Sequence, residues 1–188
     1  MTKSLAQDDR FTGGVVNIIA TYRRATEAER VEGADWYRKA GRLSAEIHPN
    51  GAAIIAALSP QKAWDINLIA ARELVATGDT KWAIEANKIK ARRIIAGERP
   101  DDVLRGPKVR AFWKAIEGQG GAVVMDRHAL GVYVGLRPNK TSMRVLERRG
   151  AYQYLANAYR RAARIIGIDA QSLQAITWVV WRKGTASA

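Results

Sequence analysis

Hydrophobic residues recur along this chain mostly at three- and four-residue intervals, which is the pattern of amphipathic helices. The apolar stripes predict helices over residues 15–22, 36–43, 64–75, 89–95, 152–166 and 172–181. The run Ala52–Leu58 is apolar throughout, so we expect a fully buried helix there. No segment alternates between apolar and polar residues for long enough to indicate a sheet. The pattern therefore predicts an all-α protein.

Glycine and proline residues mark the boundaries between the predicted helices. Pro49-Asn50-Gly51 precedes the buried helix, and Ser59-Pro60 ends it because the residue before a proline disfavours helical geometry. Gly78 closes the next stripe, and Asp169 stands where it can cap the last one. No internal repeat or long linker interrupts the chain. We expect one helical domain over residues 1–188, built as two lobes with an active cleft between them.

Charge and composition narrow the choice of partner. The 188 residues carry a formal net charge of +13, from 31 Lys and Arg against 18 Asp and Glu, and 47% of them are hydrophobic. A globular protein with this excess of positive charge is expected to bind nucleic acid. The chain has no cysteine, which excludes disulfides, thiol catalysis and iron–sulfur clusters. Two histidines and scattered carboxylates predict no metal site and no cofactor.

The sequence also bears on localisation. The first ten residues, MTKSLAQDDR, lack the apolar core of a secretion signal. The longest apolar run, Ala52–Leu58, is too short to span a bilayer. We expect a soluble protein in the cytoplasm of a bacterium or of a phage-infected host, with no membrane partner and an oligomeric state that the sequence leaves open.

The candidate chemistry lies between residues 104 and 133. Gly106-Pro107 predicts a turn before a helix that begins near Lys108, and an apolar run then leads to Asp126 at the head of another helix. Aspartate at such a position commonly caps the helix. In a cleft it can instead stabilise an oxocarbenium ion, or deprotonate a water that attacks the sugar C1′. Lys108 suits a phosphate contact first, and a nucleophile that forms a Schiff base second.

Three stretches carry a resemblance: AIIAALSPQKAWDIN (residues 53–67), Gly106-Pro107-Lys108, and VVMDRH (residues 123–128). Their order and spacing resemble the helix-hairpin-helix DNA glycosylases of the HhH-GPD superfamily, which includes endonuclease III. The likeness runs from about Gly51 to Lys183. It implies an all-α, two-lobed fold with a central cleft, and DNA N-glycosylase activity on a base flipped out of the DNA.

The same resemblance implies roles for individual residues. Asp126 would be the catalytic carboxylate, and Lys108 the nucleophile if the enzyme also cleaves the strand. Gln61 would enter the duplex and fill the space left by the flipped base. The expected DNA contacts are Gln61, Lys62, Arg105, Gly106, Arg110 and Arg127. The expected base pocket is lined by Trp36, Tyr37, Trp64 and His128, with His128 mainly supporting the fold around Asp126.

The chain also departs from the family pattern. The hairpin Leu-Pro-Gly-Val-Gly keeps only its last glycine, Gly106, so side-chain charge from Arg105, Lys108 and Arg110 would replace contacts by hairpin amides. Gly131 stands where an arginine is expected. Two other functions stay open. One is a phage enzyme that uses the same pocket to displace pyrophosphate from an activated hydroxymethyl pyrimidine with an amine. The other is a non-catalytic DNA-binding module.

Overall fold

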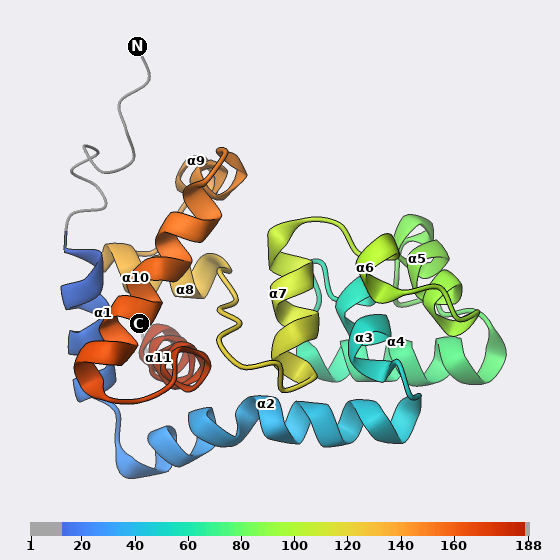
Figure 1. The fold of residues 1–188 in the computed structure, drawn as a ribbon, viewed down its shortest axis with the longest axis horizontal. Helices are drawn as coiled ribbons and strands as arrows, with labels where there is room; N and C mark the ends of the chain where they lie inside the picture. Colours follow the sequence, from blue (N-terminus) through green and yellow to red (C-terminus); the bar gives the residue numbers. More distant parts are fainter. Residues whose placement is uncertain (1–12, 187–188) are drawn as a thin grey trace. The chain divides into compact units, whose positions relative to one another are not determined.

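The computed structural model describes residues 13–186, and the side chains of residues 13–184 (Figure 1). Within that range every regular element is a helix and no strand occurs, which confirms the all-α prediction. The first ten residues, on which the expectation of no secretion signal rests, lie outside the described residues. No helix between residues 13 and 186 is both long enough and apolar enough to cross a membrane.

The chain divides into two compact units, residues 13–36 with 120–186 and residues 37–119. Helix α2 (Glu27–Ile47) contributes to both, since the division falls after Trp36. The first unit also contains α1 (Gly14–Arg23), α8 (Arg127–Val134), α9 (Lys140–Met143), the 3-10 turn η3 (Arg144–Glu147), α10 (Ala151–Ile166) and α11 (Ala170–Ala186). The second contains α3 (Gly51–Leu58), α4 (Trp64–Thr77), α5 (Glu85–Ile95), α6 (Pro100–Val103) and α7 (Pro107–Ile116).

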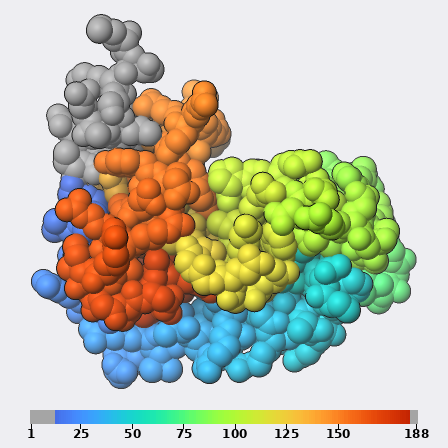
Figure 2. Space-filling model, viewed as in Figure 1, coloured from blue at the N-terminus to red at the C-terminus, as the bar shows by residue number. Residues whose placement is uncertain are grey.

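The core of the first unit forms where α1, α8, α10 and α11 pack against one another (Figure 1). Its largest fully buried side chains include Ile18, Leu130, Leu155, Tyr159 and Leu173. Helix α10 buries one face in this core, and Figure 2 shows α10, in orange, on the surface of the unit. The other face of α10 is exposed and carries arginines, Arg161 and Arg164 among them.

Helix α3 is the centre of the second unit. Every one of its residues is buried, as the uninterrupted apolar run predicted, and it packs against α4, α5 and α7. Gly51 begins the helix at a point where the backbone of α2 approaches closely. A Cβ atom at this position would overlap the carbonyl oxygen of Ser44, so the approach requires a glycine.

Three predicted helix ends are confirmed. Helix α3 ends at Leu58, directly before Ser59-Pro60. Helix α4 ends before Gly78, which takes the left-handed conformation with φ 79°. Asp169 caps α11, since its Oδ1 accepts a hydrogen bond of 2.8 Å from the N–H of Ser172.

The apolar stripe predicted for α5 was wrong at one position. Ile89 is 49% exposed, and the face that the helix buries is formed instead by Asn87, Ala91 and Ile94. These residues share one face by their four- and three-residue spacing. The sequence pattern missed that face because it contains a polar residue and a small one, whereas the larger isoleucine points to solvent.

Candidate functional site

Asp126 stands directly before α8 and caps it. Its Oδ1 atom accepts hydrogen bonds from the backbone N–H of His128 at 2.9 Å and of Ala129 at 2.8 Å. Both bonds use the same oxygen, and within the described part of the chain Oδ2 accepts none. The side chain is partly buried. The cap therefore fixes the orientation of the carboxylate while one oxygen stays free to meet another group.

Tyr152 of α10 holds the segment that leads to Asp126. Its hydroxyl donates to the carbonyl oxygen of Val123 at 3.0 Å and accepts from the N–H of Met125 at 3.0 Å. Burial, together with the negative charge of Asp126, raises the pKa of Tyr152 to about 12. The phenol is therefore protonated at neutral pH, which the bond to Val123 requires.

Two further contacts from α10 fix the same segment on either side. The Nη2 atom of Arg160 donates to the carbonyl oxygen of Gly121 at 3.1 Å, ahead of Asp126 in the chain. The hydroxyl of Tyr159 donates to the carbonyl oxygen of Ala129 at 3.1 Å, in the first turn of α8. Tyr159 is fully buried, and this burial raises its pKa. Helix α10 thus anchors the backbone both before and after the carboxylate.

An aromatic cluster lies beside the cap and consists of Trp36, His128 and Trp178. The rings of Trp36 and Trp178 have centroids 5.8 Å apart, and the ring of His128 meets Trp178 edge-on at 6.2 Å. The guanidinium of Arg182 lies 4.5 Å above Trp178, within the range of a cation–π contact. His128 joins the cluster to the carboxylate, because its backbone N–H binds Asp126.

Gly131 of α8 packs directly against Trp181 of α11. A Cβ atom on Gly131 would lie 2.8 Å from the indole ring of Trp181, so no larger side chain fits. Arg127 is the nearby cation, and its Nε lies 3.3 Å from Nε2 of His128. The positive charge next to the cap is therefore supplied by the residue that follows Asp126.

The second unit presents Gln61 on the turn between α3 and α4. Gln61 is exposed and has φ 61°, and it is the one non-glycine residue with positive φ among residues 13–186. The N–H of Lys62 closes the turn onto the carbonyl oxygen of Ser59 at 3.1 Å. The ammonium of Lys62 donates to the carbonyl oxygen of Trp82. The turn is thus defined by its own hydrogen bonds, and Gln61 points outward from it in a strained conformation.

A short turn joins α6 to α7 further along the chain. Helix α6 ends at Val103, and after Gly106, with φ 81°, helix α7 begins at Pro107, within one residue of the predicted start. No side chain caps α7, in contrast to α8. Lys108 and Arg105 are exposed, and neither has a hydrogen-bond or ion-pair partner among the described residues. The first N–H groups of α7 therefore lie open beside two cations.

Three other residues expected at the site make structural contacts within the second unit. The Nη2 atom of Arg110 binds both the carboxylate and the carbonyl oxygen of Asp101, each at 2.9 Å, and so joins α6 to α7. Trp64 packs edge-on against Phe112 with centroids 6.4 Å apart. Tyr37 is only 7% exposed. The DNA contact predicted for Arg110 and the base-pocket positions predicted for Trp64 and Tyr37 stay predictions.

The expected site residues are therefore shared between the units. Asp126, Arg127, His128 and Trp36 belong to the first, and Lys108 with the other expected residues belongs to the second. The sequence placed Trp178 only in a set of aromatic residues that could stack on a base, and Arg160 only in a basic run. It gave Tyr152 no role at the site. The i, i+4 spacing of Trp178 and Arg182 on one helix was the available signal for Trp178.

Comparison with known proteins places the chain in a family without assigning an activity. A family model described as a family of unknown function (DUF7178) matches residues 3–185, so the chain belongs to this family. No curated protein and no solved structure matches it. Within residues 13–186, no group of three or more His, Asp or Glu side chains is placed to hold a metal ion.

Proposed function

We propose that this protein is a DNA-binding enzyme that flips a base out of the duplex and cleaves its glycosidic bond, with Asp126 as the catalytic carboxylate. The observation that supports this most strongly is the way Asp126 is held. The cap fixes one of its oxygens, α10 anchors the backbone on both sides, and Oδ2 accepts no described hydrogen bond. The resemblance of VVMDRH to the glycosylase motif supports the same assignment.

A carboxylate held in this way suits glycosidic hydrolysis. As the bond between C1′ and the base breaks, positive charge develops on the sugar, and a fixed anion stabilises that charge. Water then bonds to C1′ and gives one proton to Asp126. The departing base nitrogen takes up that proton, so the base leaves neutral and the carboxylate is restored. The products are a free base and an abasic site. Trp178 and Trp36 offer ring surface next to the cap, on which an extruded base can stack.

The conformation of Gln61 supports base flipping. A left-handed conformation at a non-glycine residue costs about 1–2 kcal/mol, and such strain is typical of functional positions. An exposed amide held outward on a tight turn is suited to enter a duplex, because it can hydrogen-bond with the base left unpaired.

Base flipping can be tested by fluorescence. We expect duplex DNA with 2-aminopurine beside 5-hydroxymethyluracil to brighten when the wild-type protein binds, because the neighbouring base leaves the stack. Gln61→Ala should lose most of this increase. The matched control is Gln119→Ala, an exposed glutamine of the same unit whose amide binds Glu117. A wild-type protein that binds the DNA without any increase in fluorescence would refute base flipping.

We assign Lys108 to phosphate binding. Its ammonium is exposed at the uncapped start of α7, where backbone N–H groups and the helix dipole favour an anion. Lys108→Ala should weaken DNA binding for all sequences and reduce the dependence of log K on log salt by about one unit. Borohydride should not trap the wild-type protein on abasic DNA. Trapping that is lost in Lys108→Ala would instead make this lysine a Schiff-base nucleophile.

A further inference from the structure

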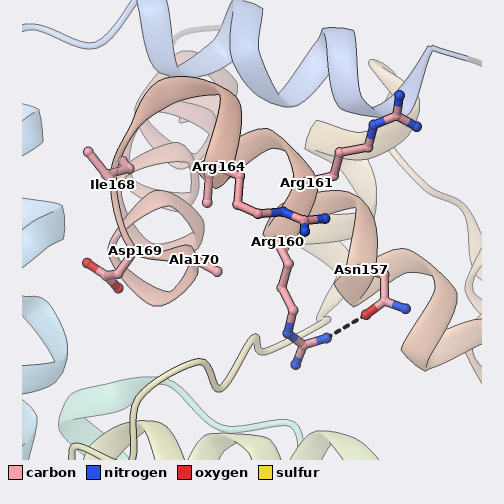
Figure 3. A pocket seen from close by; sticks show the side chains of 8 residues that line it. Asn157, Arg160, Arg161, Arg164, Ile168, Asp169 and Ala170 are labelled. Carbon is pink, nitrogen blue, oxygen red and sulfur yellow. Dashed lines mark hydrogen bonds between the residues drawn. The ribbon is translucent and has the colours of Figure 1, made fainter.

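An open groove in the first unit is lined by residues of the second half of α10 and the start of α11 (Figure 3). Its volume is about 640 Å³. The lining residues that matter are Asn157, Arg160, Arg161, Arg164, Ile168 and Asp169. The groove is therefore walled by three arginines, and it contains one carboxylate.

The positive charge of this groove is only partly neutralised, because three arginines line it and Asp169 is its one carboxylate. Arg161 and Arg164 are exposed and have no partner among the described residues. Arg160 binds only neutral oxygens, those of Asn157 at 2.9 Å and of Gly121 at 3.1 Å. The carboxylate of Asp169 caps α11 through a neutral N–H and keeps its negative charge, so the groove lining carries a net charge of +2.

The arginines of α5, in contrast, form ion pairs with carboxylates. Arg92 binds Asp79 and Glu85, and Arg93 binds Glu98. On α10, by comparison, Arg160 and Arg164 are four residues apart on one helix face, a spacing at which like charges repel each other. This repulsion destabilises the helix when no ligand is bound, and a bound anion would offset it. Such a pair of arginines is therefore expected at an anion-binding site.

We propose that this groove binds backbone phosphates of nucleic acid, a proposal that rests on the DNA-binding function proposed above. The planar guanidinium fork matches the geometry of phosphate oxygens. The arginines line an open surface groove, which suits a continuous polyanion. Arg160 also links the groove to the candidate site, because it holds Gly121, five residues ahead of Asp126. Phosphates bound here would position the strand against the unit that presents the catalytic carboxylate.

The test compares two variants that each remove one positive charge from the same unit. Arg164→Gln alters the groove but leaves the bond between Arg160 and Gly121 intact, and Arg148→Gln removes an exposed arginine that does not line it. Binding of duplex DNA is measured by fluorescence anisotropy between about 0.05 and 0.3 M salt. Loss of one phosphate contact should reduce the slope of log K against log salt by about 0.9, and affinity by about tenfold at 0.1 M salt. The control should stay within about twofold of wild type.

The outcomes separate this inference from the proposed function. A wild-type protein that does not bind DNA overturns both. A wild-type protein that binds DNA, with Arg164→Gln and Arg148→Gln indistinguishable, overturns the groove alone. Inorganic pyrophosphate provides the third arm. If it raises the melting temperature of wild type but not of Arg164→Gln, while both bind DNA equally, the groove is a small-anion pocket and the proposal is wrong.

Discussion

Replacing Tyr152 with phenylalanine removes one oxygen and two hydrogen bonds next to the candidate site. The hydroxyl donates to Val123 and accepts from Met125, both at 3.0 Å. Val123 and Met125 are 1% and 0% exposed, so water cannot readily replace the lost partner. The ring of Tyr152 stays in place, and the substitution therefore isolates the effect of these two bonds.

The magnitude follows from the two backbone groups that lose their partner. Leaving a buried donor or acceptor unsatisfied costs about 1–3 kcal/mol, and relaxation of the segment recovers part of this for a pair. We expect a loss of about 2–3 kcal/mol in the free energy of unfolding. For a chain of this length, 1 kcal/mol corresponds to about 2–4 °C, so the melting temperature should fall by about 5–10 °C.

Two measurements check this expectation. Circular dichroism gives the melting temperature, and hydrogen exchange reports whether the amide of Met125 loses its protection. The control is Tyr22→Phe, whose ring lies under Arg30 at 5.0 Å and whose hydroxyl makes no described hydrogen bond. It should stay within about 0.5 kcal/mol of wild type. A shift below about 1 °C in Tyr152→Phe, with protection of Met125 retained, would refute the anchoring role of α10.

Two further predictions concern the second unit. Gly51→Ala should destabilise the protein by about 3 kcal/mol in urea unfolding, because the new Cβ overlaps the carbonyl oxygen of Ser44. Gly78→Ala, which meets no atom within 4 Å, should cost only about 1 kcal/mol for its left-handed backbone; equal losses would contradict this account. The hydrogen bond from Lys88 holds the pKa of Asp79 below its ordinary value. The stability that this pair adds is therefore present at neutral pH and is lost as the pH falls below about 4. Lys88→Met should flatten the stability profile there, and an unchanged profile would exclude the pair as its source.

Much of the fold was predictable because it depends on local signals. Proline and glycine placed the ends of α3 and α4, and the uninterrupted apolar run identified the buried helix at the centre of the second unit. Asp126 was recognisable as a helix cap from the residues on either side of it. These features depend only on the conformational preferences of residues that are close together in the sequence.

The parts of the fold and of the candidate site that the sequence did not predict depend on contacts between residues far apart in the chain. Tyr152 binds backbone atoms 27 and 29 residues away, and nothing in the sequence around it indicates this. The contact between Trp36 and Trp178 joins α2 to α11. The sequence predicts Arg110 as a DNA contact and gives no sign that folding brings Asp101 to its guanidinium. Such pairings arise from packing, which one sequence does not display.

We propose that Asp126 acts chemically as well as capping α8. Comparing its substitution with the loss of another helix cap separates the two roles. Thr26→Ala removes another helix cap in the same unit, where Thr26 and Glu29 bind each other's backbone N–H at the start of α2. Loss of that cap should cost about 1 kcal/mol. A carboxylate that only caps would behave in the same way.

The decisive measurement is mass spectrometry of the bases and nucleosides formed when duplex DNA is incubated with wild type, Asp126→Asn and Thr26→Ala. The DNA contains thymine, 5-hydroxymethyluracil or its pyrophosphorylated form, each with and without amines. We predict a free base from one of these substrates with wild type and Thr26→Ala, and none with Asp126→Asn, which still binds the DNA. Base release that persists in Asp126→Asn, or a heavier nucleoside formed as pyrophosphate is freed, would contradict the account.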